Sequence, residues 1–320
     1  MPFVRTVLGD IDPADLGVCY AHEHVVIDGG FPVEKHPDFH LADVRRAVRE
    51  LEECRDAGLR AVVDAMPCDA GRNVVKLAEI SRRSNVHVVA PTGLHLADYY
   101  DSLHWSHTAT VEEVAALFVA DITDGIDERD YNGPLVRRTP HRAGVIKVAG
   151  SRDRLTAREE RAFEAAAAAH VETGCPILTH TQDGTAALEQ IELLGRHGVR
   201  ASAVTLSHTD KVVDAGYHRE ILSTGAFLEY DQAFRWREGQ PNGTLELLAA
   251  MFEAGFRDQL MLGTDAARQT YWHVYGGSPG LVHLLTDFSA AMEERGLGPS
   301  ERERIFVANP ARAFAFSDHP

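Results

Sequence analysis

The chain has 320 residues, 44% of them hydrophobic, a length at which α/β barrels still form a single domain. Its formal net charge of −16, from 48 acidic and 32 basic residues, disfavours binding to nucleic acid or to an anionic membrane surface. No stretch of 18 apolar residues and no signal-peptide core is found, so we expect a cytoplasmic protein with a small-molecule partner. The four cysteines are scattered without a CxxC pair, which predicts reduced thiols without a catalytic role.

A repeated unit runs along the chain. An amphipathic helix ends at a glycine, and an apolar strand that finishes on a polar side chain begins a few residues later. One predicted helix begins with Thr156 and Glu159, the spacing of a capping box. Another has an apolar side formed by Leu41, Val44, Val48, Leu51 and Cys54. The predicted strands are, in chain order, Val18–Ile27, Arg60–Met66, Val86–His95, Gly144–Ala149, Pro176–His180, Ala203–His208, Ala226–Asp231 and Gln259–Asp265.

Strands that alternate with helices predict parallel pairing through right-handed crossovers. The predicted units close most naturally into one (β/α)8 TIM barrel over residues 1–320, with its chemistry at the carboxyl ends of the strands. A doubly wound open sheet is the alternative fold, but no glycine-rich phosphate loop follows the first predicted strand. The sequence shows no domain boundary, linker or low-complexity tract.

Two histidines, His22 and His24, lie in the first predicted strand. Residues i and i+2 of an extended chain share a face, so both imidazoles point the same way and make half of a metal site. Polar side chains also end the later strands, namely His95, Lys147, His180, His208, Asp231 and Asp265. In a barrel these side chains meet at one mouth, where such a nitrogen-rich set suits zinc, manganese, iron or cobalt.

Lys147 has aliphatic neighbours on both sides. Removing an ammonium from water next to metal cations is costly, so we interpret Lys147 as a neutral amine. Addition of carbon dioxide to that amine gives a carbamate, an anionic ligand with two oxygens that is able to bridge two metals. A strand lysine whose ammonium pairs with an acid is the alternative.

The loops after the last two predicted strands are rich in arginine. Arg235 and Arg237 follow the seventh strand, and Arg268 and Tyr271 follow Asp265. Guanidinium groups match the oxygens of a phosphate or carboxylate, so these residues predict an anion pocket. A pair of solvated surface loops is the alternative.

These residues resemble the phosphotriesterase-related family of the amidohydrolase superfamily. The resemblance covers nearly the whole chain, from Thr6-Val7-Leu8-Gly9 through His22-Glu23-His24 to Asn309-Pro310-Ala311-Arg312. It implies two divalent metal ions, zinc being the first candidate and manganese, cobalt or iron the others. The implied metal ligands are His22, His24, Lys147, His180, His208 and Asp265.

Within this set, the resemblance implies that His22, His24 and Asp265 hold the more buried ion and that His180 and His208 hold the more exposed one. Carboxylated Lys147 and a hydroxide would bridge the two ions, which lie roughly 3.5–4 Å apart in sites of this kind. Asp265 would also be the catalytic residue that passes the proton of the hydroxide to the leaving group.

The chain looks most like the subgroup that hydrolyses phosphorylated sugar lactones. Arg268 and Tyr271 match the residues that grip the phosphate in that subgroup, while the choice between Arg235 and Arg237 stays open. The run Thr92-Gly93-Leu94-His95 also matches, so His95 joins the expected substrate-binding residues. The sequence therefore predicts a binuclear metal-dependent lactonase with a small anionic substrate.

Other activities remain as alternatives. Family members that act on acyl-homoserine lactones carry Tyr at His95 and Arg at Gln232, which disfavours that substrate. A phosphotriesterase-like esterase is disfavoured by polar, cationic pocket loops, while an amide hydrolase for a small anionic N-acyl substrate would use the same metals. A non-catalytic binding barrel would not need the intact ligand set. Barrels of the family often pair as homodimers, but no sequence feature shows an interface.

Overall fold

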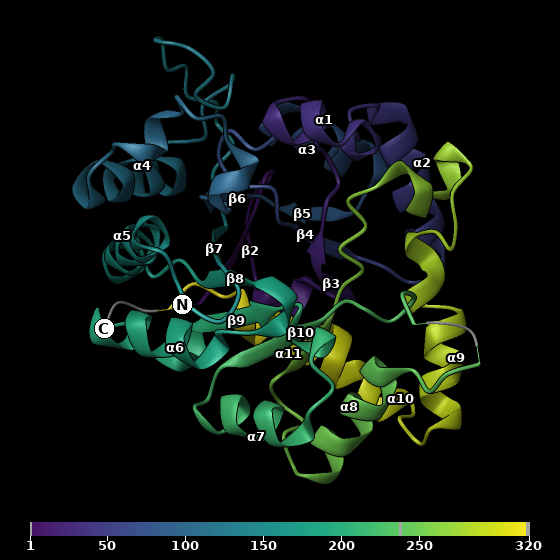
Figure 1. The fold of residues 1–320 in the computed structure, drawn as a ribbon. Helices are drawn as coiled ribbons and strands as arrows, with labels where there is room; N and C mark the ends of the chain where they lie inside the picture. The colour runs from purple at the N-terminus through teal and green to yellow at the C-terminus, as the bar shows by residue number, and fades with distance from the viewer. Residues whose placement is uncertain (1, 237–238, 318–320) are drawn as a thin grey trace.

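The structure is a computed structural model that describes residues 2–236 and 239–317. Strands run through the centre of the molecule and helices surround them (Figure 1). The strands are β1 (Val4–Thr6), β2 (Gly9–Ile11), β3 (Cys19–Glu23), β4 (Ala61–Asp64), β5 (His87–Val89), β6 (Pro91–Gly93), β7 (Val145–Gly150), β8 (Ile177–Thr181), β9 (Val204–Ser207), β10 (Phe227–Tyr230) and β11 (Leu260–Leu262). The helices are α1 (Phe31–Lys35), α2 (Val44–Asp56), α3 (Val74–Ser84), α4 (Val111–Thr123), α5 (Ala157–Thr173), α6 (Ala187–Arg196), α7 (Ala215–Ser223), α8 (Gly243–Glu253), α9 (Asp287–Glu294), α10 (Pro299–Glu303) and α11 (Asn309–Ala313).

The strands from β3 onward pair in parallel and in sequence order. Strands β3, β4 and β5 form one group, and β6 to β11 form the other. Strands β5 and β6 are separated only by Ala90, whose carbonyl accepts a hydrogen bond from Gly144 N–H. The prediction of one continuous strand over Val86–His95 is therefore wrong. The segment is interrupted at Ala90, with β5 pairing with β4 on one side and β6 pairing with β7 on the other.

The first and last barrel strands are joined through the backbone. The N–H groups of Thr264 and Asp265, just after β11, both lie 3.2 Å from the carbonyl oxygen of His22 in β3. Sequential parallel pairing with this closing contact gives the predicted (β/α)8 barrel, and the open doubly wound sheet is excluded. The carboxyl ends of the strands therefore meet at one mouth.

Local signals set the helix ends much as the sequence predicts. Helix α5 has the capping box, since Thr156 and Glu159 each bond to the other's backbone N–H. Its last carbonyl is followed by Gly174 in the left-handed conformation, with φ of 72°. Helix α2 starts at Val44, so the placement of Leu41 on this helix is wrong. Leu41 instead forms a short bridge with Ile27, which fixes the loop after β3.

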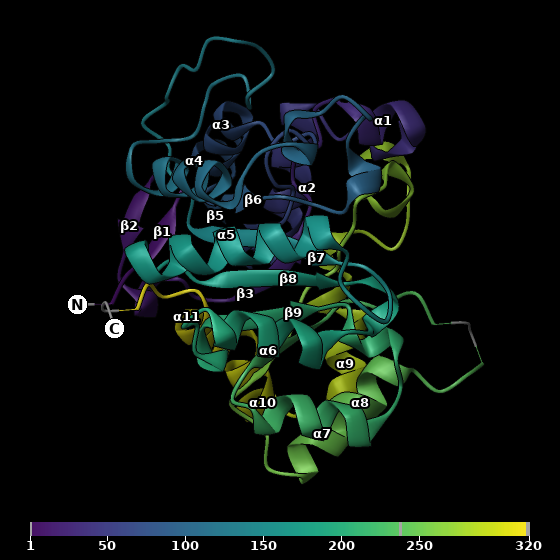
Figure 2. The same ribbon diagram turned by 60° about the vertical axis from the view of Figure 1, so that its left-hand side comes forward.

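A short antiparallel hairpin of β1 and β2, absent from the sequence prediction, lies at the opposite end of the barrel from the mouth. Phe3 stacks on Phe316 with ring centroids 4.5 Å apart, and the Arg5 guanidinium lies over both rings. The two ends of the chain are thus neighbours (Figure 2). All four cysteines are buried and free. Among the described residues, no helix has the length and apolar character needed to cross a membrane.

Candidate metal centre and active site

The mouth of the barrel brings three donors from its first and last strands together. His24 Nε2 lies 3.1 Å from Asp265 Oδ1, and His22 Nε2 lies 3.7 Å from the same oxygen. The donor atoms of these three residues all lie within 4.8 Å of one another, a spacing that suits one metal ion. Burial lowers the pKa of His22, so its ring is neutral and offers a lone pair.

Two further histidines extend this cluster toward the open side. The ring centroids of His22 and His208 are 4.7 Å apart, and those of His208 and His180 are 4.5 Å apart. His208 Nδ1 is bonded to Asp231 at 2.5 Å, which leaves Nε2 for a metal. His180 Nε2 is bonded to Gln182 at 2.8 Å, which leaves Nδ1. A carboxylate or amide on the far nitrogen is the usual way to fix the tautomer of a metal-binding histidine.

Lys147 on β7 is 1% exposed, and its Nζ has no hydrogen-bond partner among the described residues. Burial lowers the pKa of this amine to about 8. A buried nitrogen without a partner is costly, so Lys147 is available for a further group. The donor set and this isolated amine fit two divalent cations with a carbamate between them.

Two members of the cluster have an unusual backbone. Asp265 has φ of 47° and His208 has φ of 68°, both in the left-handed region that residues with a side chain seldom adopt. Such conformations persist where the surrounding structure holds them, and they concentrate at functional sites. Burial opposes ionisation of Asp265, but His208, His24 and Arg235 outweigh it and hold the pKa of this carboxyl well below its usual range.

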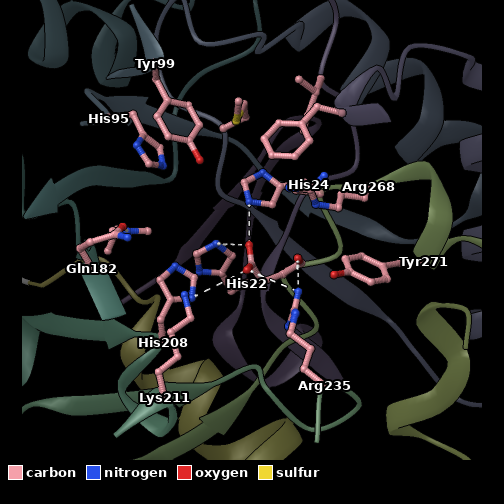
Figure 3. Close-up of a pocket in the computed structure, with 16 residues that line it drawn as sticks. His22, His24, His95, Tyr99, Gln182, His208, Lys211, Arg235, Arg268 and Tyr271 are labelled. Carbon is pink, nitrogen blue, oxygen red and sulfur yellow. Dashed lines mark hydrogen bonds and ion pairs between the residues drawn. The ribbon is translucent and has the colours of Figure 1, made fainter. Parts of the chain in front are cut away.

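A cavity of about 260 Å³ opens directly above the cluster. In Figure 3, His95, Tyr99 and Gln182 lie on one side of it, Arg268 and Tyr271 on the other, and Arg235 below. The lining residues are His22, His24, Ile27, Phe39, Met66, His95, Tyr99, His180, Gln182, His208, Lys211, Arg235, Asp265, Ala267, Arg268 and Tyr271. The structure therefore gathers every predicted site residue at the mouth except Lys147, which is buried below the cavity, and Arg237, which lies outside the described residues.

The predicted anion-binding residues are held by other groups around the cavity. Arg235 donates to the carbonyl oxygen of Asp265 at 2.6 Å, and its guanidinium lies 5.2 Å from the Tyr271 ring centroid. Arg268 bonds instead to Asp38, from the loop after β3. His95 stacks on Tyr99, with ring centroids 3.5 Å apart. Both arginines therefore line the cavity while hydrogen bonds to other residues hold their guanidinium groups.

The sequence analysis missed several polar residues of the site. Lys211 lines the cavity and lies three residues after His208, so its place in the loop beyond a barrel strand was a usable signal. Glu229 lies two residues before Asp231 on the same face of β10, with Oε2 3.6 Å from His22 Nδ1. Gln182 was hidden, since only the fold shows that it reaches His180.

A closed parallel barrel with imidazole and carboxylate donors grouped at the strand ends defines the class of barrel hydrolases that depend on metal ions. Residues 2–314 match the sequence model of the Phosphotriesterase family, and the chain belongs to this family. The recognition made from the sequence is thereby confirmed.

Similar proteins agree with this placement. The chain is 35% identical to a phospho-furanose lactonase of Mycoplasmopsis synoviae (strain 53) over 329 aligned residues, covering 99% of this chain and 92% of the relative. Among solved structures, an amidohydrolase from Mycoplasma synoviae is similar with a TM-score of 0.95 and 33% identity, over 100% of this chain and 93% of the other. A lactonase from Listeria monocytogenes is similar with a TM-score of 0.91 and 29% identity, over 99% and 100%.

Proposed function

We propose that the chain is a metal-dependent hydrolase that opens the ring of a phosphorylated sugar lactone. The observation that carries this proposal is a single cavity of about 260 Å³ with the His/Asp cluster at its base and cationic side chains around it. A sugar lactone with its phosphate fits the chemistry of such a cavity, since the base holds the reacting carbonyl and the walls hold the anion. The names of the similar lactonases support the same reaction.

The residues that would hold two divalent ions are His22, His24, Lys147 as its carbamate, His180, His208 and Asp265. We propose zinc as the first candidate, because neutral imidazoles and carboxylate oxygens suit it. When bound, a pair of such ions makes a water nucleophilic at neutral pH and polarises a carbonyl oxygen. All of these side chains come from one chain, so the reaction does not require the homodimer expected from the resemblance.

Asp265 is the proposed catalytic base. Its carboxylate is ionised and lines the cavity, where it can accept a proton from the attacking water as the water oxygen bonds to the lactone carbonyl carbon. The ring carbon–oxygen bond then breaks, and Asp265 returns the proton to the ring oxygen, which leaves as a hydroxyl. The product is a hydroxy acid that keeps its phosphate.

Four polar side chains are proposed to place the substrate. Arg268 and Tyr271 would bind the phosphate from the strand β11 loop, with Arg235 beneath and Lys211 beside His208. Holding the phosphate fixes the distance between the carbonyl and the base of the cavity, which lowers the barrier by orientation. Loss of the phosphate from the substrate should therefore weaken binding and also slow the chemistry.

The test is hydrolysis of a panel of sugar lactones, each with and without a terminal phosphate, followed with a pH indicator at a measured metal content. Much faster turnover of each phosphorylated member than of its dephosphorylated analogue is the expected result. Two metal ions per chain without turnover of any lactone would overturn the proposal and move the search to N-acyl amides of small anionic amines. Equal rates with and without phosphate would overturn the proposed role of the cationic walls.

A further inference from the structure

Glu23, the last residue of β3, lies between His22 and His24 but does not line the cavity. Its side chain leaves the opposite face of the strand and is completely buried. There Oε1 accepts hydrogen bonds from Thr264 N–H at 2.8 Å and from Thr264 Oγ1 at 2.6 Å, and Oε2 also lies 2.6 Å from that hydroxyl. Burying an acid lowers the stability of the fold unless hydrogen-bond partners such as these satisfy its oxygens.

Thr264 directly precedes Asp265, the residue whose φ is 47°. Aspartate adopts this left-handed conformation more readily than most residues with a side chain, but it is still uncommon, so contacts that stabilise it matter. The backbone carbonyl of His22 takes both N–H groups of this turn, each at 3.2 Å. The Glu23 carboxyl accepts hydrogen bonds from the Thr264 hydroxyl and from the Thr264 N–H, which also points at the His22 carbonyl. Two consecutive residues of β3 therefore bind this turn.

We propose that Glu23 is a positioning residue that fixes the Thr264–Asp265 turn, so that the Asp265 carboxylate faces His22 and His24. The relative positions of the three donors, His22, His24 and Asp265, would then be set together, because the segment that carries the histidines also binds the turn that carries the aspartate. The inference rests on the proposed metal-binding role of Asp265 and adds a residue that neither binds metal nor touches substrate. It also explains why a glutamate stands at this position, since a shorter acid would not reach Thr264.

Two pairs of variants test the contact. Thr264→Val removes the hydroxyl at nearly constant shape, whereas Thr264→Ser keeps it. Glu23→Ala removes both acceptors, whereas Glu23→Gln keeps an oxygen for the N–H and gains an amide that donates to Thr264 Oγ1. The matched control is Thr179→Val on β8, because the buried Thr179 hydroxyl has no hydrogen-bond partner in the part of the chain that the structure describes.

Metal affinity of the stripped protein is the main readout, measured by competition with a chromophoric chelator. We expect Thr264→Val and Glu23→Ala to weaken it by about 10- to 100-fold, the usual effect of losing a contact that orients a metal ligand. Thr264→Ser, Glu23→Gln and Thr179→Val should stay within about threefold of the wild type. This rescue by the conservative variants separates positioning from general destabilisation.

Melting of the metal-free protein is measured alongside. If Thr264→Val lowers the melting temperature but leaves metal affinity unchanged, Glu23 only stabilises the fold and the inference is overturned. If Glu23→Ala does not fold, the Thr264→Val and Thr264→Ser pair still decides. None of these readouts involves a lactone, so a protein that shows the expected metal affinities but hydrolyses no lactone contradicts the proposed function alone.

Discussion

Arg268 and Asp38 form an ion pair across the mouth of the barrel, with Nη1 2.5 Å from Oδ2. The arginine follows β11, while the aspartate belongs to the loop after β3, 230 residues earlier. The Arg268 guanidinium also lies over the Phe39 ring, 4.7 Å from its centroid. A guanidinium has five N–H donors, and Asp38 engages only Nη1 among the described residues, so the Nε and Nη2 edge remains for an anion.

The first prediction concerns this ion pair. Asp38→Asn should raise the KM of a phosphorylated lactone about three- to fivefold, because the guanidinium loses one of its two supports. KM for the dephosphorylated analogue and the melting temperature should not change, since half-exposed ion pairs contribute about 0–1 kcal/mol. Steady-state kinetics on both substrates provides the measurement.

Asp98→Asn is the matched control, because Asp98 lies in the short 3-10 helix Ala97–Tyr99 and, within the described part of the chain, its side chain makes no hydrogen bond while its backbone oxygen accepts one from Lys35. This variant should behave as the wild type on both substrates. A lower KM in Asp38→Asn would contradict the prediction, since it would show that Asp38 competes with the substrate for Arg268.

The second prediction concerns Lys147. Lys147→Ala should bind less than a full complement of metal and lose activity, because the proposed bridging ligand disappears. A short carboxylic acid with added metal should restore part of both, since it supplies the missing pair of oxygens. Metal analysis and kinetics check this, with Lys35→Ala as the control for loss of a lysine charge. Full activity in Lys147→Ala would rule out a carbamate at this position.

The third prediction concerns pH. Only the neutral amine of Lys147 can add carbon dioxide, and burial lowers the pKa of this amine to about 8. Below that pH the neutral fraction falls about tenfold per unit, so reactivation of stripped enzyme at fixed dissolved carbon dioxide and excess metal should slow as pH falls. The rate should level off about one pH unit above this pKa, where roughly nine-tenths of the amine is neutral.

The measurement is the recovery rate of activity between about pH 6 and 10, with carbon-13 NMR of the carbamate as a second readout. A rate that rises about tenfold per unit through pH 9 would show an ordinary exposed lysine. A rate independent of pH would show that carbon dioxide addition does not limit recovery.

The sequence predicted most of the barrel strands and the grouping of imidazole and carboxylate donors at the mouth, because simple periodicities carry both. His22 and His24 share a strand face by their spacing, and the barrel topology then forces His180, His208 and Asp265 to the same mouth. No long-range contact had to be known in advance. The order of strands along the chain was enough.

Contacts between irregular segments could not be predicted in this way. The pairs Arg268–Asp38 and Thr264–Glu23 join residues more than 200 positions apart, and no periodicity relates them. Such contacts depend on how the strands close, which a single sequence does not record. The break at Ala90 was missed although Pro91 offered a signal, since a proline cannot donate to a ladder and commonly stands at the start of a strand.

The last prediction concerns Gly93, which pairs with Lys147 across β6 and β7. Its φ is 116°, and a Cβ added there would lie 1.8 Å from the Lys147 carbonyl oxygen, so an alanine must push the two strands apart. Gly93→Ala should lower stability by about 4 kcal/mol or more, together with metal content, because Lys147 moves with its strand. Gly255→Ala is the matched control, since φ is 92° but, apart from Gly255 and its two chain neighbours, no atom of the described residues lies within 4 Å of its added Cβ. There the loss should be about 1–2 kcal/mol of backbone strain, with metal content unchanged. Thermal melting and metal analysis are carried out on both variants. Equal losses of stability and of metal content in the two would contradict the prediction, because they would show that the close approach of β6 to Lys147 does not matter for either.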